Sequence, residues 1–295
     1  MLEERLLRAA LYVERHLGEP LSLERLADEA CISTYHFHRL FRLWLGEPVM
    51  EYVRRLRLEH AAYRLRASTR PVGTIAREVG YASADAFGRA FRERFGESPR
   101  AYQARWAASS APVEPPTRLP EAQGLAAPNA TSADAPARVR VTRLDAWYLI
   151  GLRHLGPYQG VWRTWAALAE WAEREAPALL AAPRIGISHD DPEMVEGSKI
   201  RYDACYAVGT AESIAMRALA RPPLHWRAMP AGEYAVTIHQ GAYDELGVAY
   251  RRLFIDWLPR SGWYPGDAPV VEWYRNSPRE VAESELRTAL LLPLV

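Results

Sequence analysis

The residue of this sequence whose type and setting most clearly suggest a chemical role is Glu272, in the β-strand-like run Pro269-Val270-Val271-Glu272-Trp273-Tyr274. Successive side chains of a β-strand point to opposite faces, so Glu272 and Tyr274 are expected to share one face, opposite Trp273. A carboxylate among aromatic rings is suited to binding a cation, because a buried acid needs a partner and aromatic faces attract positive charge. The alternation alone leaves open whether the face of Glu272 lines a cleft or meets solvent.

The residue types of enzymes and metal sites occur without the spacing that their chemistry needs. Ser188, His189 and Asp190 are the types of a catalytic triad, but direct neighbours in one loop cannot adopt its geometry. Cys31 and Cys205 are isolated in the sequence, so a disulfide framework or a zinc site is not expected. Neither a Gly-x-Ser-x-Gly motif nor a phosphate-binding loop occurs. We therefore expect no catalytic residue, no metal and no cofactor.

Two arginine-bearing helical segments point to a different chemistry, the recognition of nucleic acid. In the first segment, the residues at helical spacing on the apolar face are Phe37, Leu40, Phe41 and Trp44, and those on a second face are Tyr35, His38, Arg39 and Arg42. In the second segment, Phe87, Ala90, Phe91 and Phe95 face inward, and Asp85, Gly88, Arg89 and Arg92 face outward. A polar, arginine-bearing face near a helix N-terminus is what a major-groove reader requires.

The two segments are copies of one unit. Ser33, Phe37, Arg39, Phe41, Arg42, Gly46, Glu47 and Tyr52 recur, each with the same residue type, 50 positions later. Ser33 and Ser83 stand where a helix needs an N-cap, and each is expected to accept a hydrogen bond from a backbone N–H group. Solvated arginines would be the simpler interpretation of one such helix, but two matched copies favour a paired DNA-binding motif. Residues 49–66 are expected to form one helix that connects the copies.

Residues 20–106 resemble the DNA-binding domain of the AraC/XylS family of transcription regulators. The resemblance is carried by Ala76-Arg77-Glu78-Val79-Gly80-Tyr81, by the spacing of Phe87, Arg89, Phe91, Phe95 and Gly96, and by Ser98-Pro99-x-x-Tyr102. It implies double-stranded DNA as a partner, with RNA polymerase as a further candidate. It also implies base contacts from Tyr35, His38 and Arg39 in the first helix and from Ala84, Asp85, Gly88 and Arg89 in the second. Ala84 and Gly88 depart from the polar residues of well-known members, so the second helix is expected to rely on Arg89, DNA shape and phosphate contacts.

Composition separates the chain into two domains. Residues 107–136 contain 9 Ala and 6 Pro among 30 residues and no aromatic residue, which predicts an interdomain linker. We therefore expect a DNA-binding domain over 1–106 and a second domain over 137–295. Residues 1–110 carry 18 Arg against 14 acidic residues, which is mild support for a polyanionic partner at this end. No apolar run is long enough for a membrane span and no signal-peptide core occurs, so a cytoplasmic protein without membrane contact is expected.

The C-terminal domain also repeats itself. His154-Leu155-Gly156-Pro157-Tyr158 matches His239-Gln240-Gly241-Ala242-Tyr243 at an offset of 85, and two later prolines match at 86. Each copy has a strand-like run, a helix after the Gly-x-Tyr, and two further β-rich runs. The expected fold is thus multi-domain, α and α+β. An all-α double helix-turn-helix domain precedes an effector-binding domain with a pseudo-twofold βαββ repeat and a cleft between its halves. The position equivalent to Glu272 is Gly186.

Residues 137–295 resemble the GyrI-like effector-binding domain. The matching motifs are His154-x-Gly156-Pro157-Tyr158, Arg201-Tyr202-Asp203-Ala204-Cys205, Pro230-Ala231-Gly232-x-Tyr234, Trp257-Leu258-Pro259 and Glu272-x-Tyr274. In multidrug-sensing relatives a glutamate at the Glu-x-Tyr position pairs with cationic aromatic ligands. The resemblance therefore implies a small-molecule effector, cationic and aromatic, at Glu272 and Tyr274. Aromatic residues of the same domain complete the candidate pocket: Trp147, Tyr158, Tyr206, Tyr243 and Trp273. For any one of these aromatic residues a place in the core is favoured, and only the set together indicates a pocket.

Two other functions stay open for this domain. Some GyrI-like proteins resemble hydrolases of electrophilic small molecules that use a pocket acid, a role that Glu272 could serve, although Gly186 supplies no second carboxylate. A protein-interaction module is the other alternative, and it would predict an exposed apolar patch in place of a closed cleft.

Overall fold

The computed structural model describes residues 2–108, 139–190, 192, 195–210, 213–266 and 268–295. The chain divides into two compact units, Met1–Ala111 and Pro112–Val295, which are described separately. Of the predicted linker over 107–136, Ala107 and Ala108 belong to the last helix of the first unit, and the rest lies outside the described residues.

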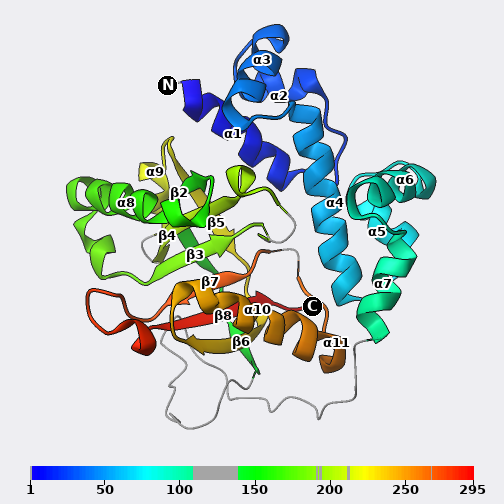
Figure 1. The fold of residues 1–295 in the computed structure, drawn as a ribbon. Coiled ribbons are helices and arrows are strands. Elements are labelled where there is room, and N and C mark those ends of the chain that lie inside the picture. The colour runs from blue at the N-terminus through cyan, green and yellow to red at the C-terminus, as the bar shows by residue number, and fades with distance from the viewer. Residues whose placement is uncertain (1, 109–138, 191, 193–194, 211–212, 267) are drawn as a thin grey trace. The chain divides into compact units, whose positions relative to one another are not determined.

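The first unit is helical throughout its regular structure. Its helices are α1 (Leu2–Arg15), α2 (Leu23–Glu29), α3 (Thr34–Leu45), α4 (Val49–Ala67), α5 (Val72–Glu78), α6 (Ala84–Phe95) and α7 (Pro99–Ala108). The pairs α2–α3 and α5–α6 are the two predicted helix-turn-helix copies, and α4 is the predicted connecting helix (Figure 1). At the centre of the predicted apolar faces, Phe37, Phe41, Phe87 and Phe91 have no exposed surface. The other predicted members are Ala90, which is buried, and Leu40, Trp44 and Phe95, which are half-buried.

The ends of the second helix of each copy follow the sequence closely, with one exception. Gly46 and Gly96 end α3 and α6 with φ of 73° and 77°, a left-handed conformation that favours glycine. Ser83 caps α6 as predicted, accepting a hydrogen bond from Ala86 N at 3.2 Å. The corresponding prediction for Ser33 is wrong, because its hydroxyl instead pairs with His36 Nδ1 at 2.9 Å.

The second unit is built on one antiparallel sheet with strand order β1-β6-β8-β7-β3-β4-β2-β5. The strands are β1 (Arg140–Leu144), β2 (Trp147–Leu155), β3 (Arg184–Ser188), β4 (Arg201–Val208), β5 (Leu224–Met229), β6 (Gly232–Gln240), β7 (Val271–Tyr274) and β8 (Arg287–Pro293). The helices are α8 (Val161–Glu175), α9 (Ser213–Leu219) and α10 (Leu246–Arg251), which continues through a π-helical segment (Arg252–Trp257) into α11 (Leu258–Ser261). Helix α8 packs on β2 and β4, and α10 packs on β6 (Figure 1).

The sheet has a pseudo-twofold axis between its two central strands. In the β3–β7 pair Gly186 lies directly opposite Glu272, and these two residues occupy equivalent positions of the repeat. Moving outward, β4 corresponds to β8, β2 to β6 and β5 to β1. The predicted βαββ halves are present, and each half contains one further strand. These strands are exchanged, since β1 pairs with β6 of the second half and β5 pairs with β2 of the first.

The two faces of this sheet are buried in different ways. One face carries an apolar core that draws on all eight strands and includes Trp147, Leu149, Ile185, Cys205, Val271, Trp273 and Leu291. On the other face Leu168, Ala172 and Leu179, from α8 and the turn after it, pack on Ile150, Tyr202, Ala204 and Tyr206. Glu272 belongs to the second face, because it lies opposite Gly186, which lies opposite Ala204.

Candidate functional site

Glu272 lies on the pseudo-twofold axis with 4% of its surface exposed. Its Oε1 accepts hydrogen bonds from Ser188 Oγ at 2.6 Å and from Tyr250 OH at 2.8 Å. Its Oε2 accepts one from Tyr274 OH at 2.5 Å. These donors come from β3, from α10 and from β7, the strand of Glu272 itself, so two elements that are distant in sequence converge on its carboxylate.

A chain of donors extends from this carboxylate toward α8. Tyr202 OH lies 2.8 Å from Tyr274 OH and, because Tyr274 donates to Glu272, Tyr202 is the donor to Tyr274. Trp165 Nε1 in turn donates to Tyr202 OH at 3.2 Å. The ring of Trp165 meets the ring of Tyr274 edge-on, with centroids 5.9 Å apart. These side chains form a chain of hydrogen bonds that runs from Trp165 on α8 through Tyr202 and Tyr274 to the carboxylate of Glu272. We call this chain the relay.

Gly186 makes room for this relay. A Cβ atom at Gly186 would lie 2.3 Å from the hydroxyl of Tyr202 and 2.6 Å from that of Tyr274, so any other residue here would force these hydroxyls to move. Gly186, the residue equivalent to Glu272, has no side chain. The hydroxyls of Tyr202 on β4 and Tyr274 on β7 occupy the space that a side chain there would take. A second carboxylate at this position would displace them.

Burial keeps the hydroxyls of the relay protonated. Desolvation, followed by the negative charge of Glu272, raises the pKa of Tyr202, Tyr250 and Tyr274 well above the usual value. All three hydroxyls are therefore neutral hydrogen-bond donors at physiological pH.

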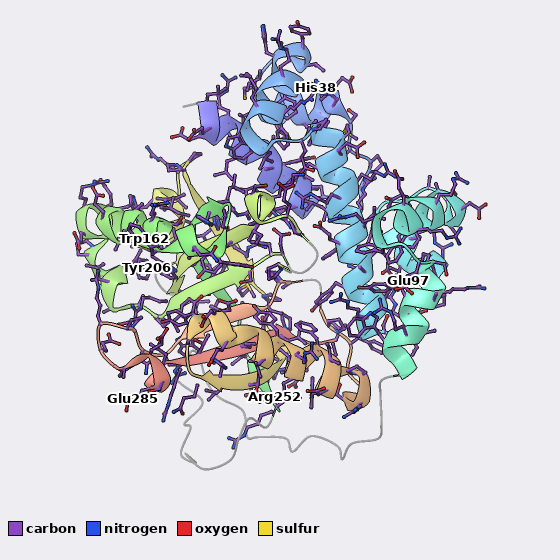
Figure 2. All side chains as sticks on the ribbon, viewed as in Figure 1. His38, Glu97, Trp162, Tyr206, Arg252 and Glu285 are labelled. Carbon is purple, nitrogen blue, oxygen red and sulfur yellow. The ribbon has the colours of Figure 1, made fainter. Side chains whose placement is uncertain are left out.

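The structure brings four of the predicted pocket aromatics to this face. Tyr274 donates directly to Glu272, and the ring of Tyr243 meets that of Tyr274 edge-on at 5.2 Å. The ring of Tyr158 meets that of Tyr202 at 6.2 Å, and the ring of Tyr206 meets that of Trp165 at 6.2 Å. Tyr206 of β4 and Trp162 of α8 are labelled in Figure 2.

The prediction that Trp147 and Trp273 line the same site is wrong. Both belong to the apolar core on the opposite face of the sheet, and each has less than a tenth of its surface exposed. The backbone of β7 separates Trp273 from Glu272, since adjacent residues of a strand point to opposite faces.

Four residues of the network were not identified from the sequence: Ser188, Trp165, Tyr202 and Tyr250. The internal repeat held a signal for all but Tyr202. Trp165 and Tyr250 are equivalent at the offset of 85, and Ser188 and Tyr274 at 86. Each half of the repeat thus sends one aromatic residue from its helix and one hydroxyl from its central strand toward the axis.

A second buried cluster lies on the opposite face of the sheet, around Asp203. Its carboxylate, fully buried, is paired with Arg153, lies 2.8 Å from His189 Nε2 and lies 3.2 Å from His225 Nε2. Arg227 stands 3.8 Å away. Desolvation alone would raise the pKa of Asp203, but the charges of Arg153 and the two histidines hold it well below its usual value. The cluster joins β2, β3, β4 and β5, which indicates a structural role.

The repeated histidines of the C-terminal domain also have structural contacts. His154 Nε2 lies 3.0 Å from the carbonyl of Pro157, and His239 Nε2 lies 3.0 Å from the carbonyl of Ala242. Each histidine thereby closes the turn that leads from a long strand into the helical segment of its half.

The candidate DNA-binding residues lie mostly on the surface of the first unit. In α3, Tyr35, Arg39 and Arg42 are exposed and His38, labelled in Figure 2, is half-buried. Arg39 donates to Tyr35 OH at 3.1 Å, so these two side chains form a pair on the surface. In α6, Ala84, Asp85, Arg89 and Arg92 are exposed, and a side chain at Gly88 would meet open space.

Comparison with known proteins identifies both domains. Residues 138–295 match the model of the GyrI-like small molecule binding domain, and residues 26–105 match that of a helix-turn-helix domain. The chain is 35% identical over 111 residues to the transcriptional regulator Rob of Salmonella typhimurium, a match that spans 38% of each chain. It is 33% identical over 94 residues to the regulatory protein SoxS of Escherichia coli K12, covering 32% of this chain and 88% of SoxS.

Among solved structures, the DNA-binding domain of AdpA in complex with a target DNA is 31% identical. The match covers 35% of this chain and 93% of the AdpA domain, with a TM-score of 0.34.

A helix-turn-helix domain joined to a small-molecule binding domain defines a DNA-binding transcription regulator. The chain belongs to the GyrI-like family, as an AraC/XylS-type regulator with a GyrI-like domain after its DNA-binding domain. The match to Rob covers well under two thirds of that protein's length. Among the described helices, none combines the length and the apolar character that crossing a membrane requires.

Proposed function

We propose that this regulator responds to small aromatic cations that bind at Glu272. The observation that carries the proposal is the set of hydrogen-bond partners of that buried carboxylate within the described residues, Ser188, Tyr250 and Tyr274, which are all neutral hydroxyls. A buried anion without a cationic partner is costly, and a ligand cation would offset that cost. A neutral ligand would gain nothing from the charge.

The aromatic side chains around Glu272 support the ligand class further. The ring of Tyr274, whose hydroxyl donates to the carboxylate, meets the rings of Trp165 and Tyr243 edge-on, and Tyr243 has 37% of its surface exposed. Aromatic cations can place their rings against these side chains while their charge faces the acid. Tyr158 and Tyr206 flank the relay at its α8 end and belong to the same proposed site.

Calorimetry tests this proposal with a matched pair of ligands. Glu272→Gln keeps the shape of the site and removes its charge, so we expect tetraphenylphosphonium to lose about 1–3 kcal/mol of binding free energy. Neutral triphenylphosphine oxide should bind both proteins alike, because its ring contacts are untouched. Isothermal titration of both compounds into the full chain provides the measurement.

Glu285→Gln is the control, because it removes the same charge from an exposed position of the same domain. Equal affinity of tetraphenylphosphonium for the wild-type protein and Glu272→Gln would rule out Glu272 as the effector site.

We favour binding over hydrolysis or protein interaction at this site. Hydrolysis by a pocket acid is less well supported, because the equivalent position is Gly186 and two tyrosine hydroxyls occupy the space above it. A protein-interaction module would place its key side chains on the surface, whereas Glu272 is buried. The homologues Rob and SoxS are regulators, in keeping with a role as sensor.

For the first unit, we propose that α3 and α6 read base pairs. Exposed arginines in the middle of each helix support this. The proposed base-reading residues are Tyr35, His38 and Arg39 in α3 and Ala84, Asp85, Gly88 and Arg89 in α6. Arg42 and Arg92, one turn further on, are suited to phosphate contacts. A regulator of this kind acts in the cytoplasm, where it meets DNA and, we propose, RNA polymerase.

The domain boundaries lead to a further prediction. Limited proteolysis should cut first between Ala107 and Pro136, because the composition of that segment offers little apolar surface to bury. We expect two fragments that resist further digestion and that mass spectrometry assigns to residues 1–106 and 137–295. First cuts inside either range would contradict these boundaries.

A further inference from the structure

The turn that precedes the first helix-turn-helix copy, between α1 and α2, meets the turn inside the second copy, between α5 and α6, through the backbone at two glycines. A Cβ atom at Gly18, between α1 and α2, would lie 2.6 Å from the carbonyl oxygen of Glu78. A Cβ atom at Gly80, between α5 and α6, would lie 2.6 Å from the carbonyl oxygen of Leu17. Gly80 also has φ of +87°, which disfavours other residues. The two turns are therefore packed too closely to admit a side chain between them.

Arg57 of the connecting helix α4 stabilises this contact through hydrogen bonds to the turn between α1 and α2. Its Nε donates to the carbonyl of Leu17 at 2.9 Å, and its Nη2 donates to the carbonyl of Glu19 at 2.7 Å. Its guanidinium carbon would lie 2.7 Å from a Cβ at Gly80, so the group fills the space beside that glycine. Partial burial lowers the pKa of the Arg57 guanidinium. The group remains a donor to two backbone carbonyls.

Ion pairs also join α4 to the second helix-turn-helix copy, α5–α6. Arg54 of α4 pairs with Glu93 of α6, and Arg94 of α6 lies 3.6 Å from Glu59 of α4. Arg64 of α4 lies 2.6 Å from the carboxylate of Glu78 at the end of α5. Together with Arg57, these contacts attach α4 to the turn before α2 and to both helices of the second copy.

Two recognition helices held in a fixed relative position can contact the DNA together only when their two target segments have one particular spacing. The 19 residues of α4 span about 28 Å at 1.5 Å per residue, comparable to one turn of the duplex. Inserting one base pair shifts one contacted segment by about 3.4 Å and rotates it by about 35° relative to the other. If α3 and α6 were joined by a flexible hinge, both helices could follow that shift. If their relative position is fixed, one of them loses its contacts to the bases.

We propose that the turn junction, defined as Leu17–Glu19, Arg57 and Glu78–Gly80, fixes the phase between α3 and α6. The regulator then recognises a two-part operator at a single spacing. Arg57, Gly18 and Gly80 are positioning residues in this arrangement and touch no base. The inference rests on the proposed reading of base pairs by both helices.

A spacer series tests the turn junction. The probe is a duplex selected from a random library by the full chain, together with versions carrying one base pair inserted or deleted between the two contacted segments. We expect the wild-type protein to bind the altered duplexes about tenfold or more weakly, the effect of losing one set of base contacts. Arg57→Met, which keeps bulk but removes both hydrogen bonds, should reduce this penalty below about threefold, with little change on a duplex holding one segment.

Three further measurements make the result decisive. Gly80→Ala, which crowds Leu17 and Arg57 at a positive φ, should relax the spacing dependence in the same direction. Arg15→Ala, the charge-matched control whose side chain donates to the carbonyl of Leu11 in its own helix, should keep the wild-type spacing dependence. Melting temperatures of all variants separate relaxed spacing from loss of fold.

An unchanged spacing penalty in both junction variants, or equal weakening on every duplex, would overturn the role of the turn junction. Protection of a single segment by the wild-type protein would instead overturn the reading of base pairs by both helices. The two failures are thus distinguishable.

Discussion

Replacing Asp203 by asparagine should lower the free energy of unfolding of the C-terminal domain by about 3–5 kcal/mol, the range measured when one partner of a buried ion pair is removed. The variant leaves the guanidinium of Arg153, of which 1% is exposed, without its carboxylate. Asparagine retains the size of the side chain, so the loss reflects charge and not a cavity. Urea unfolding of the full chain, followed by tryptophan fluorescence, measures the effect.

Asp244→Asn is the matched control, since that carboxylate is exposed, and it should change stability by less than about 0.5 kcal/mol. The effect of Asp203→Asn should also depend on pH. Because the folded-state pKa of Asp203 is held well below its usual value, its contribution is fully present above the unfolded pKa of about 4. It is lost as pH falls further, through the folded pKa, so the difference between the two proteins should shrink below about pH 4. A constant difference from pH 7 to pH 3 would contradict the ion-pair account.

The second large effect concerns DNA. Arg39→Ala and Arg89→Ala should each weaken specific binding by about 1–3 kcal/mol if each arginine reads a base. The two residues lie on separate helices of separate copies, so their effects should add, and the double variant should lose about 2–6 kcal/mol. Fluorescence anisotropy with a duplex selected by the wild-type protein, at one fixed salt concentration, measures this loss.

Non-specific binding provides the control for this experiment. A scrambled duplex contacts the same arginines only through phosphates, so the double variant should lose much less affinity there than on the selected duplex. Equal losses on both duplexes would mean that Arg39 and Arg89 contribute charge and no base recognition.

The helices of the first unit were predictable because their information is local. Helical spacing gave the buried faces of α3 and α6, and the 50-residue repeat identified α4 as their connection. The contacts of the turn junction were not predictable. Arg57 bonds to backbone carbonyls 38 and 40 positions away, and the carbonyl group is the same in every residue.

In the C-terminal domain, the alternation in β7 correctly separated Glu272 from Trp273, yet Trp273 was still assigned to the site because aromatic composition carries no information about faces. The repeat gave the two halves, but it could not show that β1 and β5 are exchanged between them, since equivalent strands have equivalent sequences in either arrangement. The relay through Tyr202 was hidden for a similar reason. It depends on the pairing of β3 with both β4 and β7, which brings Gly186 beside two tyrosines.

The claim that this regulator reads DNA with two helices is tested most directly by methylation interference on the selected duplex. Methyl groups at guanine N7 block the major-groove contacts that arginine makes most often. We predict interference in two segments on one face of the DNA, about 10–10.5 bp apart. Arg39→Ala should abolish the interference in one segment and Arg89→Ala that in the other. A pattern that neither substitution changes would contradict the assignment of α3 and α6 as the reading helices.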